Sequence, residues 1–157
     1  MRDTVTAYVA IGANLGDAAR AVRDAIARLG ALPQTRLVRH SSLYRTAPVE
    51  AAGPDYVNAV AQIATGLSAP ELLAQLQRFE DEAGRERPYP HAPRTLDLDL
   101  LLFGAGRIDS PRLTVPHPRM DQRAFVLVPL AEIAPQLVSA AQLRAVGNQV
   151  LTRLPPA

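Results

Sequence analysis

Cysteine and lysine are both absent from this sequence of 157 residues. Without cysteine, the chain cannot form disulfides, use a thiol nucleophile, or bind zinc or iron–sulfur clusters through thiolates. Without lysine, it cannot form a Schiff base or build a Walker-type phosphate loop. All 17 basic residues are therefore arginines, and any bound phosphate must be held by arginine, backbone amides or a metal ion.

Histidine, net charge and long apolar runs are also scarce. The three histidines are scattered and do not indicate a histidine-based zinc site, and a formal net charge of +2 does not indicate a nucleic-acid or membrane partner. No apolar run approaches the roughly 20 residues needed to cross a bilayer. No signal peptide precedes the first predicted strand, so we expect a cytoplasmic protein.

The residues that are present describe an ordinary globular chain. Hydrophobic residues make up 48% of the sequence and charged residues 20%, which predicts a single domain over residues 1–157 with its own core. Hydrophobic periodicity predicts four strands and two helices in the order β-α-β-β-α-β. The strands are expected at Val5–Ile11, Arg36–Tyr44, Tyr56–Thr65 and Thr95–Phe103, and the helices at residues 15–29 and 68–83.

This order is that of the ferredoxin-like α+β sandwich, in which two helices cover one face of an antiparallel sheet. The spacing of Ser68 and Glu71 predicts a capping box at the start of the second helix. A C-terminal extension follows, with an apolar segment at Phe125–Ile133 and a helix near Ser139–Leu154. Because such a fold hosts many functions, the function must be argued from a site.

Two aspartates stand out in the otherwise leucine-rich fourth strand. Alternation along a strand projects Asp97 and Asp99 from one face and the leucines at 96, 98, 100 and 102 from the other. Two residues of strand separate their Cα atoms by about 6.6–6.8 Å, which allows both carboxylates to reach one ion or a pair of ions. Magnesium, a hard cation that prefers oxygen ligands, would offset their repulsion. A structural ion pair with Arg94 and a solvated strand end are the alternatives.

Three arginines precede this pair, at Arg85, Arg87 and Arg94. Arginine binds phosphate through two parallel hydrogen bonds, and a metal-bound triphosphate needs positive charge on its other side. A solvated basic loop is the alternative interpretation. Next to an acidic pair, the arginines indicate a phosphate site.

Five stretches of the chain form recognisable motifs. The most specific is Ala92–Leu101, which contains both aspartates, and the others are Ala7–Leu15, Leu43–Pro48, Pro54–Ala59 and Leu113–Pro118. Together they resemble the 6-hydroxymethyl-7,8-dihydropterin pyrophosphokinase family of folate biosynthesis, and the resemblance runs from about residue 5 to residue 138.

The resemblance implies transfer of pyrophosphate from ATP to the pterin hydroxymethyl group, with release of AMP. It implies that Asp97 and Asp99 hold two Mg²⁺ ions and that Arg85 and Arg94 complete the catalytic set. The implied ATP-binding residues are Gln77, Glu80, Arg85, Arg94, His117 and Arg123. The implied pterin-binding residues are Thr46, Pro48, Val49, Tyr56, Asn58 and Phe125. A monomer with small-molecule partners only is the corresponding expectation.

The sequence departs from the family pattern at three positions. Pro90 and His91 stand where many members carry a basic residue and a tryptophan, and Pro118 stands where an aromatic residue is common. The assignment of Arg87 to the phosphates is correspondingly weaker than that of Arg85. His91 is a candidate replacement for the tryptophan as a cover over the substrate.

Two other functions use some of the same features. A two-metal nuclease or nucleotidyltransferase could use the aspartate pair, but the sequence lacks the further spaced carboxylates and general base of such enzymes. A ferredoxin-like RNA-binding module would need aromatic residues for base stacking, and these make up only 4% of the chain. The sequence therefore favours a magnesium-dependent pyrophosphokinase.

Overall fold

The computed structural model describes residues 3–14, 16–47, 55–84 and 96–156. Its main sheet has 6 strands, in the order β5-β1-β4-β3-β8, with β2 also paired to β4 beside β3, and every pairing is antiparallel. The strands are β1 (Val5–Ala13), β2 (Thr35–His40), β3 (Tyr44–Thr46), β4 (Tyr56–Thr65), β5 (Asp97–Phe103) and β8 (Leu151–Arg153). A separate hairpin joins β6 (Ile108–Asp109) and β7 (Thr114–Val115). The helices are α1 (Ala18–Gly30), α2 (Ala69–Gly84), α3 (Ala124–Ile133) and α4 (Ala140–Ala145).

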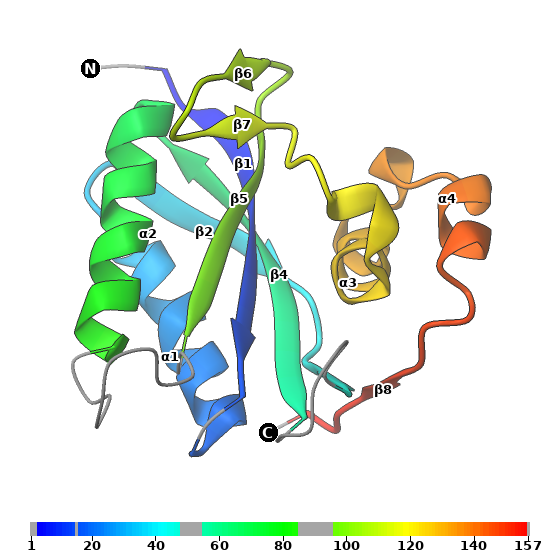
Figure 1. The fold of residues 1–157 in the computed structure, drawn as a ribbon. Coiled ribbons are helices and arrows are strands. Elements are labelled where there is room, and N and C mark those ends of the chain that lie inside the picture. The colour runs from blue at the N-terminus through cyan, green and yellow to red at the C-terminus, as the bar shows by residue number, and fades with distance from the viewer. Residues whose placement is uncertain (1–2, 15, 48–54, 85–95, 157) are drawn as a thin grey trace.

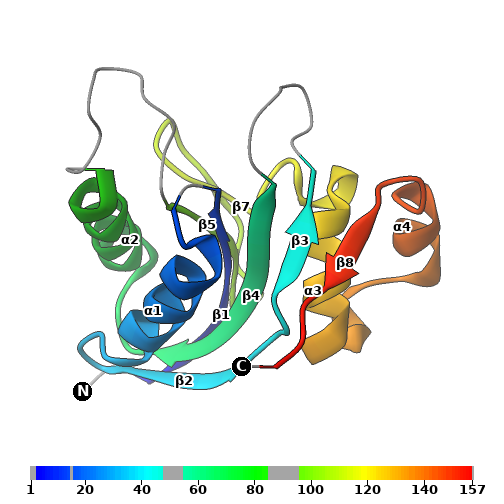
Figure 2. The same cartoon turned by 90° about the horizontal axis from the view of Figure 1, so that it is seen from below.

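The helices lie on both faces of the sheet. Figure 2 shows α1 and α2 on one side and α3 and α4 on the other, and Figure 1 shows the hairpin of β6 and β7 leading from β5 toward α3. The predicted combination of helices with an antiparallel sheet is confirmed. The C-terminal extension therefore supplies the layer that covers the second face.

Local sequence explains where the two long helices begin. Asp17 caps α1 by accepting a hydrogen bond from the Arg20 amide at 3.1 Å. The capping box predicted before α2 is confirmed, because the Ser68 amide donates to Glu71 Oε1 at 2.9 Å and the Glu71 amide donates to Ser68 Oγ at 3.2 Å. Each helix then buries one apolar stripe against the sheet.

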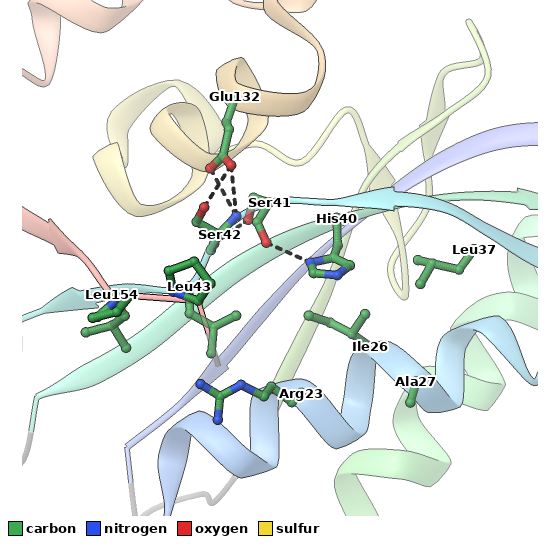
Figure 3. A pocket seen from close by; sticks show the side chains of 12 residues that line it. Arg23, Ile26, Ala27, Leu37, His40, Ser41, Ser42, Leu43, Glu132 and Leu154 are labelled. Atoms are coloured by element: carbon green, nitrogen blue, oxygen red, sulfur yellow. Dashed lines mark hydrogen bonds between the residues drawn. The ribbon is translucent and has the colours of Figure 1, made fainter.

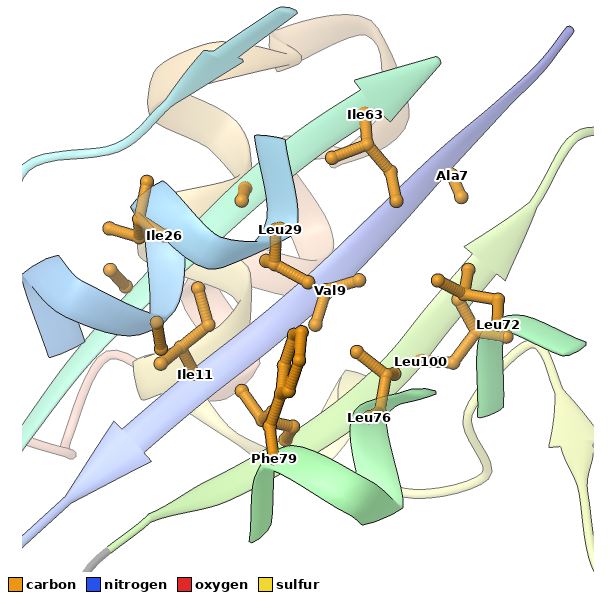
Figure 4. Close-up of a cluster of buried hydrophobic side chains, with 14 of the residues drawn as sticks. Ala7, Val9, Ile11, Ile26, Leu29, Ile63, Leu72, Leu76, Phe79 and Leu100 are labelled. Atoms are coloured by element: carbon orange, nitrogen blue, oxygen red, sulfur yellow. The ribbon is translucent and has the colours of Figure 1, made fainter. Parts of the chain in front are cut away.

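The central strands are buried on both faces. Figure 4 shows Val9 and Ile11 of β1 among side chains from α1 and α2, including Leu76 and Phe79. The intervening β1 positions face a second core built around α3, whose members include Tyr8, Val60, Leu101, Leu127 and Leu130. Burial on both faces explains why β1 and β4 are apolar over nearly their whole length.

The predicted strand Arg36–Tyr44 is wrong in its continuity, because it is divided into β2 and β3. At the break, the Ser41 amide donates to the Val60 carbonyl at 2.8 Å, and the Val60 amide donates to Ser41 Oγ at 2.9 Å. A side-chain hydroxyl thus takes the place of a backbone acceptor. Such local competition by serine frees the chain to change direction between the two strands.

The predicted helix near Ser139–Leu154 is also wrong in its extent. It ends as α4 at Ala145, and the later residues form β8, whose Arg153 lies opposite Tyr44 of β3. The β5 strand begins at Asp97, and Thr95 lies outside the described residues. A register shift in the pairing of β1 with β5 changes the alternation, so Leu102 packs against the α3 core rather than with Leu98 and Leu100.

Candidate active site on the α3 face of the sheet

Asp97 and Asp99 lie on the face of the sheet that α3 covers. Between and beside them, Leu98 and Leu100 are 4% and 3% exposed and belong to the opposite core under α1 and α2. Asp97 is exposed, and Asp99 is partly buried. The alternation predicted for the two aspartates and these two leucines is therefore present, and both carboxylates face the same side.

Three strands align a row of residues across this face. Asp97 lies opposite Gly12, and Gly12 lies opposite Asn58 on its other side. Two strand spacings of about 4.7–4.9 Å each place Asp97 and Asn58 roughly 10 Å apart. In the next row on the same face, Asp99 lies opposite Ala10. The acidic pair on β5 and Asn58 on β4 thus lie on either side of β1, with Gly12 directly between Asp97 and Asn58.

Asn58 is a buried polar residue, 6% exposed, and its orientation is set by a neighbour. Its Nδ2 donates to Thr46 Oγ1 at 2.9 Å, from β4 to β3. A Cβ at Gly12 would lie 2.9 Å from Asn58 Oδ1, closer than real Cβ contacts allow. Gly12 therefore leaves the room that the amide occupies. The predicted strand ends at Ile11, but β1 continues to Ala13, and only this places Gly12 inside the strand, beside Asn58.

His117 reaches the acidic pair from the segment between β7 and α3. Its amide donates to the Leu101 carbonyl at 3.0 Å, which ties the segment to β5. Its Nδ1 accepts from the Arg119 amide at 3.2 Å, so the neutral ring carries its proton on Nε2, which lies 3.9 Å from Asp99 Oδ1.

The pKa of His117 depends on its burial and on four charged neighbours. Burial lowers the pKa of His117 below its ordinary value, and Arg123 and Arg119 lower it further, while Asp99 and Asp97 oppose the shift. Histidine, arginines and aspartates are thus close enough to interact. A neutral imidazole with an outward N–H can donate a hydrogen bond to an anionic ligand.

Arg123 and Phe125 lie at the beginning of α3. The Arg123 guanidinium carbon is 5.4 Å from the Phe125 ring centroid, a cation–π contact that restrains both side chains. Phe125 is partly buried. Tyr56, two residues before Asn58 and on the same face of β4, is 37% exposed. The two predicted stacking residues thus keep accessible surface, unlike core aromatics such as Phe79.

Glu80 supports the acidic strand from α2. Its Oε2 accepts from the Leu98 amide at 2.8 Å, the residue between the two aspartates. This contact satisfies an outward backbone donor of β5 and holds the strand at the point where both carboxylates are mounted. Gln77, one helical turn earlier, is exposed.

The predicted residues that lie outside the described part of the chain are Pro48, Val49, Arg85, Arg87, Pro90, His91 and Arg94.

The donor set indicates what kind of metal site is possible. Within residues 3–14, 16–47, 55–84 and 96–156, no group of three or more His, Cys, Asp and Glu side chains could hold an ion. Magnesium commonly binds one or two carboxylates and completes its octahedron with waters and substrate phosphates. The aspartate pair fits that arrangement, in which much of the coordination comes with the nucleotide.

A cavity of about 540 Å³ lies elsewhere, between α1, the end of β2 and residues 154–156 (Figure 3). It is lined mainly by apolar side chains and contains none of the predicted site residues. This cavity is therefore separate from the candidate active site.

No helix in the part of the chain that the structure describes is both long enough and apolar enough to span a bilayer.

Comparison with known proteins gives consistent results. The family model of 7,8-dihydro-6-hydroxymethylpterin-pyrophosphokinase (HPPK) matches residues 8–135. The 2-amino-4-hydroxy-6-hydroxymethyldihydropteridine pyrophosphokinase of Haemophilus influenzae is 48% identical over 151 residues, which cover 96% of this chain and 91% of that protein. The protein of the same name from Pseudomonas aeruginosa is 49% identical over 131 residues, or 83% of this chain and 81% of that protein.

Solved structures resemble this fold at much lower identity. A triple mutant of Plasmodium falciparum HPPK-DHPS superposes with a TM-score of 0.71 at 13% identity, covering 94% of this chain and 43% of that one. Wild-type Plasmodium falciparum HPPK-DHPS gives a TM-score of 0.66 at 14% identity, covering 92% of this chain and 41% of that one. The present chain spans less than half of those proteins, and the likeness concerns the fold alone.

Proposed function

Because the chain belongs to the 7,8-dihydro-6-hydroxymethylpterin-pyrophosphokinase family, we propose that it transfers the pyrophosphoryl group of ATP to the hydroxymethyl oxygen of 6-hydroxymethyl-7,8-dihydropterin and releases AMP. The chain is an ATP-dependent pyrophosphokinase of folate synthesis. The observation that supports the proposed chemistry best is the placement of Asp97 and Asp99 on one face, with Asn58 two strands away.

We assign the donor side of the site to the aspartate pair. Asp97 and Asp99 would hold Mg²⁺, which neutralises phosphate charge and aligns the attacking and leaving oxygens. His117 would donate its Nε2 proton to a phosphate oxygen, and Arg123 would supply positive charge near it. Glu80 acts through the Leu98 amide, because it fixes the strand on which both aspartates stand. Gln77, Arg85 and Arg94 remain predictions of the sequence.

We assign the acceptor side to the surface beyond Gly12. The Asn58 amide, already oriented by Thr46, would hydrogen-bond the polar edge of the pterin, while Tyr56 and Phe125 offer accessible rings for stacking. A flat heteroaromatic ring suits this combination of one fixed amide and two aromatic side chains. Pro48 and Val49 remain predicted members of the same pocket.

The order of Asp97, Gly12 and Asn58 across the sheet suggests how the two substrates would approach each other. If Asp97 and Asp99 on β5 hold the phosphates through Mg²⁺ and Asn58 on β4 holds the acceptor, the hydroxymethyl oxygen would approach the β-phosphorus across β1. The chain thus contributes mainly orientation and charge stabilisation, which are the principal sources of rate in phosphoryl-type transfer. We also propose the ferredoxin-like arrangement for the β-α-β-β-α-β part, and the order β5-β1-β4-β2, with β1 and β4 in the centre, supports it.

The test is an AMP-formation assay with ATP, magnesium and 6-hydroxymethyl-7,8-dihydropterin. We expect Asp97→Ala and Asp99→Ala each to lower kcat by at least about 100-fold, the scale of losing a preorganised charge at a reacting group. Asp24→Ala, which removes an exposed carboxylate from α1, is the matched control and should keep full activity. Wild-type activity in either site variant would contradict the metal assignment, and nucleic-acid cleavage without AMP formation would favour a nuclease.

The predicted monomeric state, cytoplasmic location and small-molecule partners complete this proposal. Size-exclusion chromatography with light scattering, at the concentration used for the assay, tests the monomer. A stable dimer would contradict that part of the proposal without affecting the proposed reaction.

A further inference from the structure

Glu132, in the last turn of α3, is the centre of a hydrogen-bond cluster. Its Oε1 accepts from the Tyr44 hydroxyl at 2.6 Å and from the Ser42 amide at 3.0 Å. Its Oε2 accepts from the Ser42 amide at 3.1 Å, the Ser42 hydroxyl at 2.9 Å and Arg153 Nη2 at 3.2 Å. One carboxylate thus joins three segments that are far apart in the sequence.

The members of this cluster also contact one another. Arg153 Nε donates to Ser42 Oγ at 2.8 Å, which links β8 directly to the residues before β3. Figure 3 shows the Glu132 carboxylate directed at Ser42 between α3 and the strand layer. We call Ser42, Tyr44, Glu132 and Arg153 the Glu132 cluster.

The cluster adjoins the acceptor side of the site through β3. Tyr44 lies directly opposite Asn58 in the pairing of β3 with β4, and Thr46, two residues further on, accepts the Asn58 Nδ2 hydrogen bond. Any shift of β3 along β4 would therefore displace the group that orients the Asn58 amide.

The strand β3 needs such support because it is short. It contains three residues, and the backbone ladder is interrupted on its N-terminal side at Ser41. Over three residues, strand pairing supplies only a few backbone hydrogen bonds to hold β3 in place. Glu132 belongs to α3 and binds Ser42 and Tyr44, which follow the break, so it sets the position of β3 relative to the helix.

From these contacts we infer that Glu132 is a positioning residue for the acceptor, acting through Tyr44 and Ser42 on the Thr46–Asn58 hydrogen bond. This inference rests on the proposed function, because it takes Asn58 as the acceptor-binding amide. It assigns Glu132 no contact with either substrate. The proposed ATP side stands on β5, which β1 and β4 separate from β3 in the sheet, so it should be unaffected.

The charge state of the cluster is consistent with this role. Burial raises the pKa of Glu132, but the hydrogen bonds from Tyr44 and Ser42 and the charge of Arg153 outweigh it, and the net direction is downward. Burial and the Glu132 carboxylate raise the pKa of Tyr44 to about 12. An ionised acceptor and a protonated donor therefore persist across the neutral range.

A purely structural role for Glu132 would instead predict that its loss loosens α3 from the sheet and lowers stability. The helix α3 is held to the sheet by fully buried apolar side chains, Leu127 and Leu130 among them. Removing one carboxylate at the end of the helix leaves that packing in place. Loss of the cluster should therefore alter β3 more than it alters the attachment of α3.

The experiment measures steady-state kinetics with each substrate varied separately. For Glu132→Gln we expect the KM for the pterin to rise about tenfold, which is the scale of losing hydrogen bonds to a charged group, while the KM for ATP stays within about twofold. Tyr44→Phe, which keeps the ring and removes one bond, should give a smaller change in the same direction. Glu82→Gln, which removes a carboxylate that joins α1 to α2 through Arg28, is the matched control and should change neither KM.

Equal increases in both KM values, or a lower urea midpoint with both KM values unchanged, would overturn the inference. If Glu132→Gln does not fold, Tyr44→Phe and Ser42→Ala decide the question by the same split between the two KM values. Wild-type protein that forms no AMP would refute the proposed function itself. If the wild type forms AMP and Glu132→Gln has the same KM for the pterin as the wild type, only the positioning role is refuted.

Discussion

Replacing Gly12 with alanine places one methyl group between the two halves of the site. The new Cβ would lie 2.9 Å from Asn58 Oδ1, and ordinary contact begins at 3.4 Å, so the amide would have to move by about 0.5 Å. The Asn58–Thr46 hydrogen bond is already 2.9 Å long, and a shift of that size takes it beyond the usual range for N–H···O. The substitution therefore acts on the orientation of Asn58.

The magnitude follows from competing contributions. Leaving a buried amide without its partner costs about 1–3 kcal/mol, while replacing glycine in a strand recovers about 0.5–1 kcal/mol of unfolded-state entropy. Gly12 has no left-handed φ, so the backbone accepts alanine. The free energy of unfolding should therefore fall by at most about 2.5 kcal/mol, which leaves the protein folded. The acceptor should lose about 1–3 kcal/mol of binding or transition-state stabilisation, or roughly 5- to 150-fold in kcat/KM for the pterin.

The assay is AMP formation with the pterin varied at saturating ATP, and with ATP varied at saturating pterin. Gly66→Ala is a close control, because its Cβ would also meet an amide oxygen at 2.9 Å, that of Gln34, at the opposite end of β4. We expect a change in kcat/KM for the pterin in Gly12→Ala only. Unchanged pterin kinetics in Gly12→Ala, with the substitution verified, would refute the assignment of Asn58 as the acceptor-binding amide.

Three further predictions concern the strands and helices around the site. Glu80→Ala should leave the Leu98 amide without its acceptor and raise the KM for ATP more than that for the pterin, as measured by the same assay; an unchanged KM for ATP would exclude a role for this contact. Because the folded-state pKa of Tyr44 is raised to about 12, its stabilising effect is complete below pH 10 and is lost as pH rises toward 12. Urea unfolding from pH 9 to 12 should therefore show a steeper loss of stability in the wild type than in Tyr44→Phe, by up to about 2–3 kcal/mol, and parallel curves would contradict the shift. Leu76→Ala, at a fully buried position on the sheet-facing side of α2, should lower the free energy of unfolding by about 2–5 kcal/mol in urea titrations, and a loss below 1 kcal/mol would contradict the packing described.

Sequence patterns were sufficient for the elements whose own residues favour them. The helices α1 and α2 carry an apolar stripe and a cap, and β1 and β4 are long and apolar, so local signals and tertiary packing agree. The strand β8 has no such pattern, since it is three residues long and partly exposed, and it exists because β3 offers it an edge. The break at Ser41 depends on a contact with Val60, 19 residues away, which periodicity does not reveal.

The site divides in the same way. Strand alternation was sufficient to put Asp97 and Asp99 on one face, because that relation is local. The contacts that support them are not local: Glu80 reaches Leu98 across 18 residues, and Glu132 reaches Ser42 across 90. The family resemblance predicts Glu80 as a site residue but does not predict its bond to the Leu98 amide. Neither resemblance nor pattern indicated Gly12 or Glu132, whose roles appear only when the strands are placed in register.

The position of β5 at the border of the sheet also bears on solubility. In the described residues β5 pairs with β1 alone, and its sequence is rich in leucine, a combination that would attract strands from other molecules. The carboxylates of Asp97 and Asp99, together with the Glu80 carboxylate at the Leu98 amide, make that border unfavourable for such pairing. The aspartates that we assign to the nucleotide thereby also discourage self-association. Variants that neutralise them should be checked by light scattering before a loss of activity is attributed to chemistry.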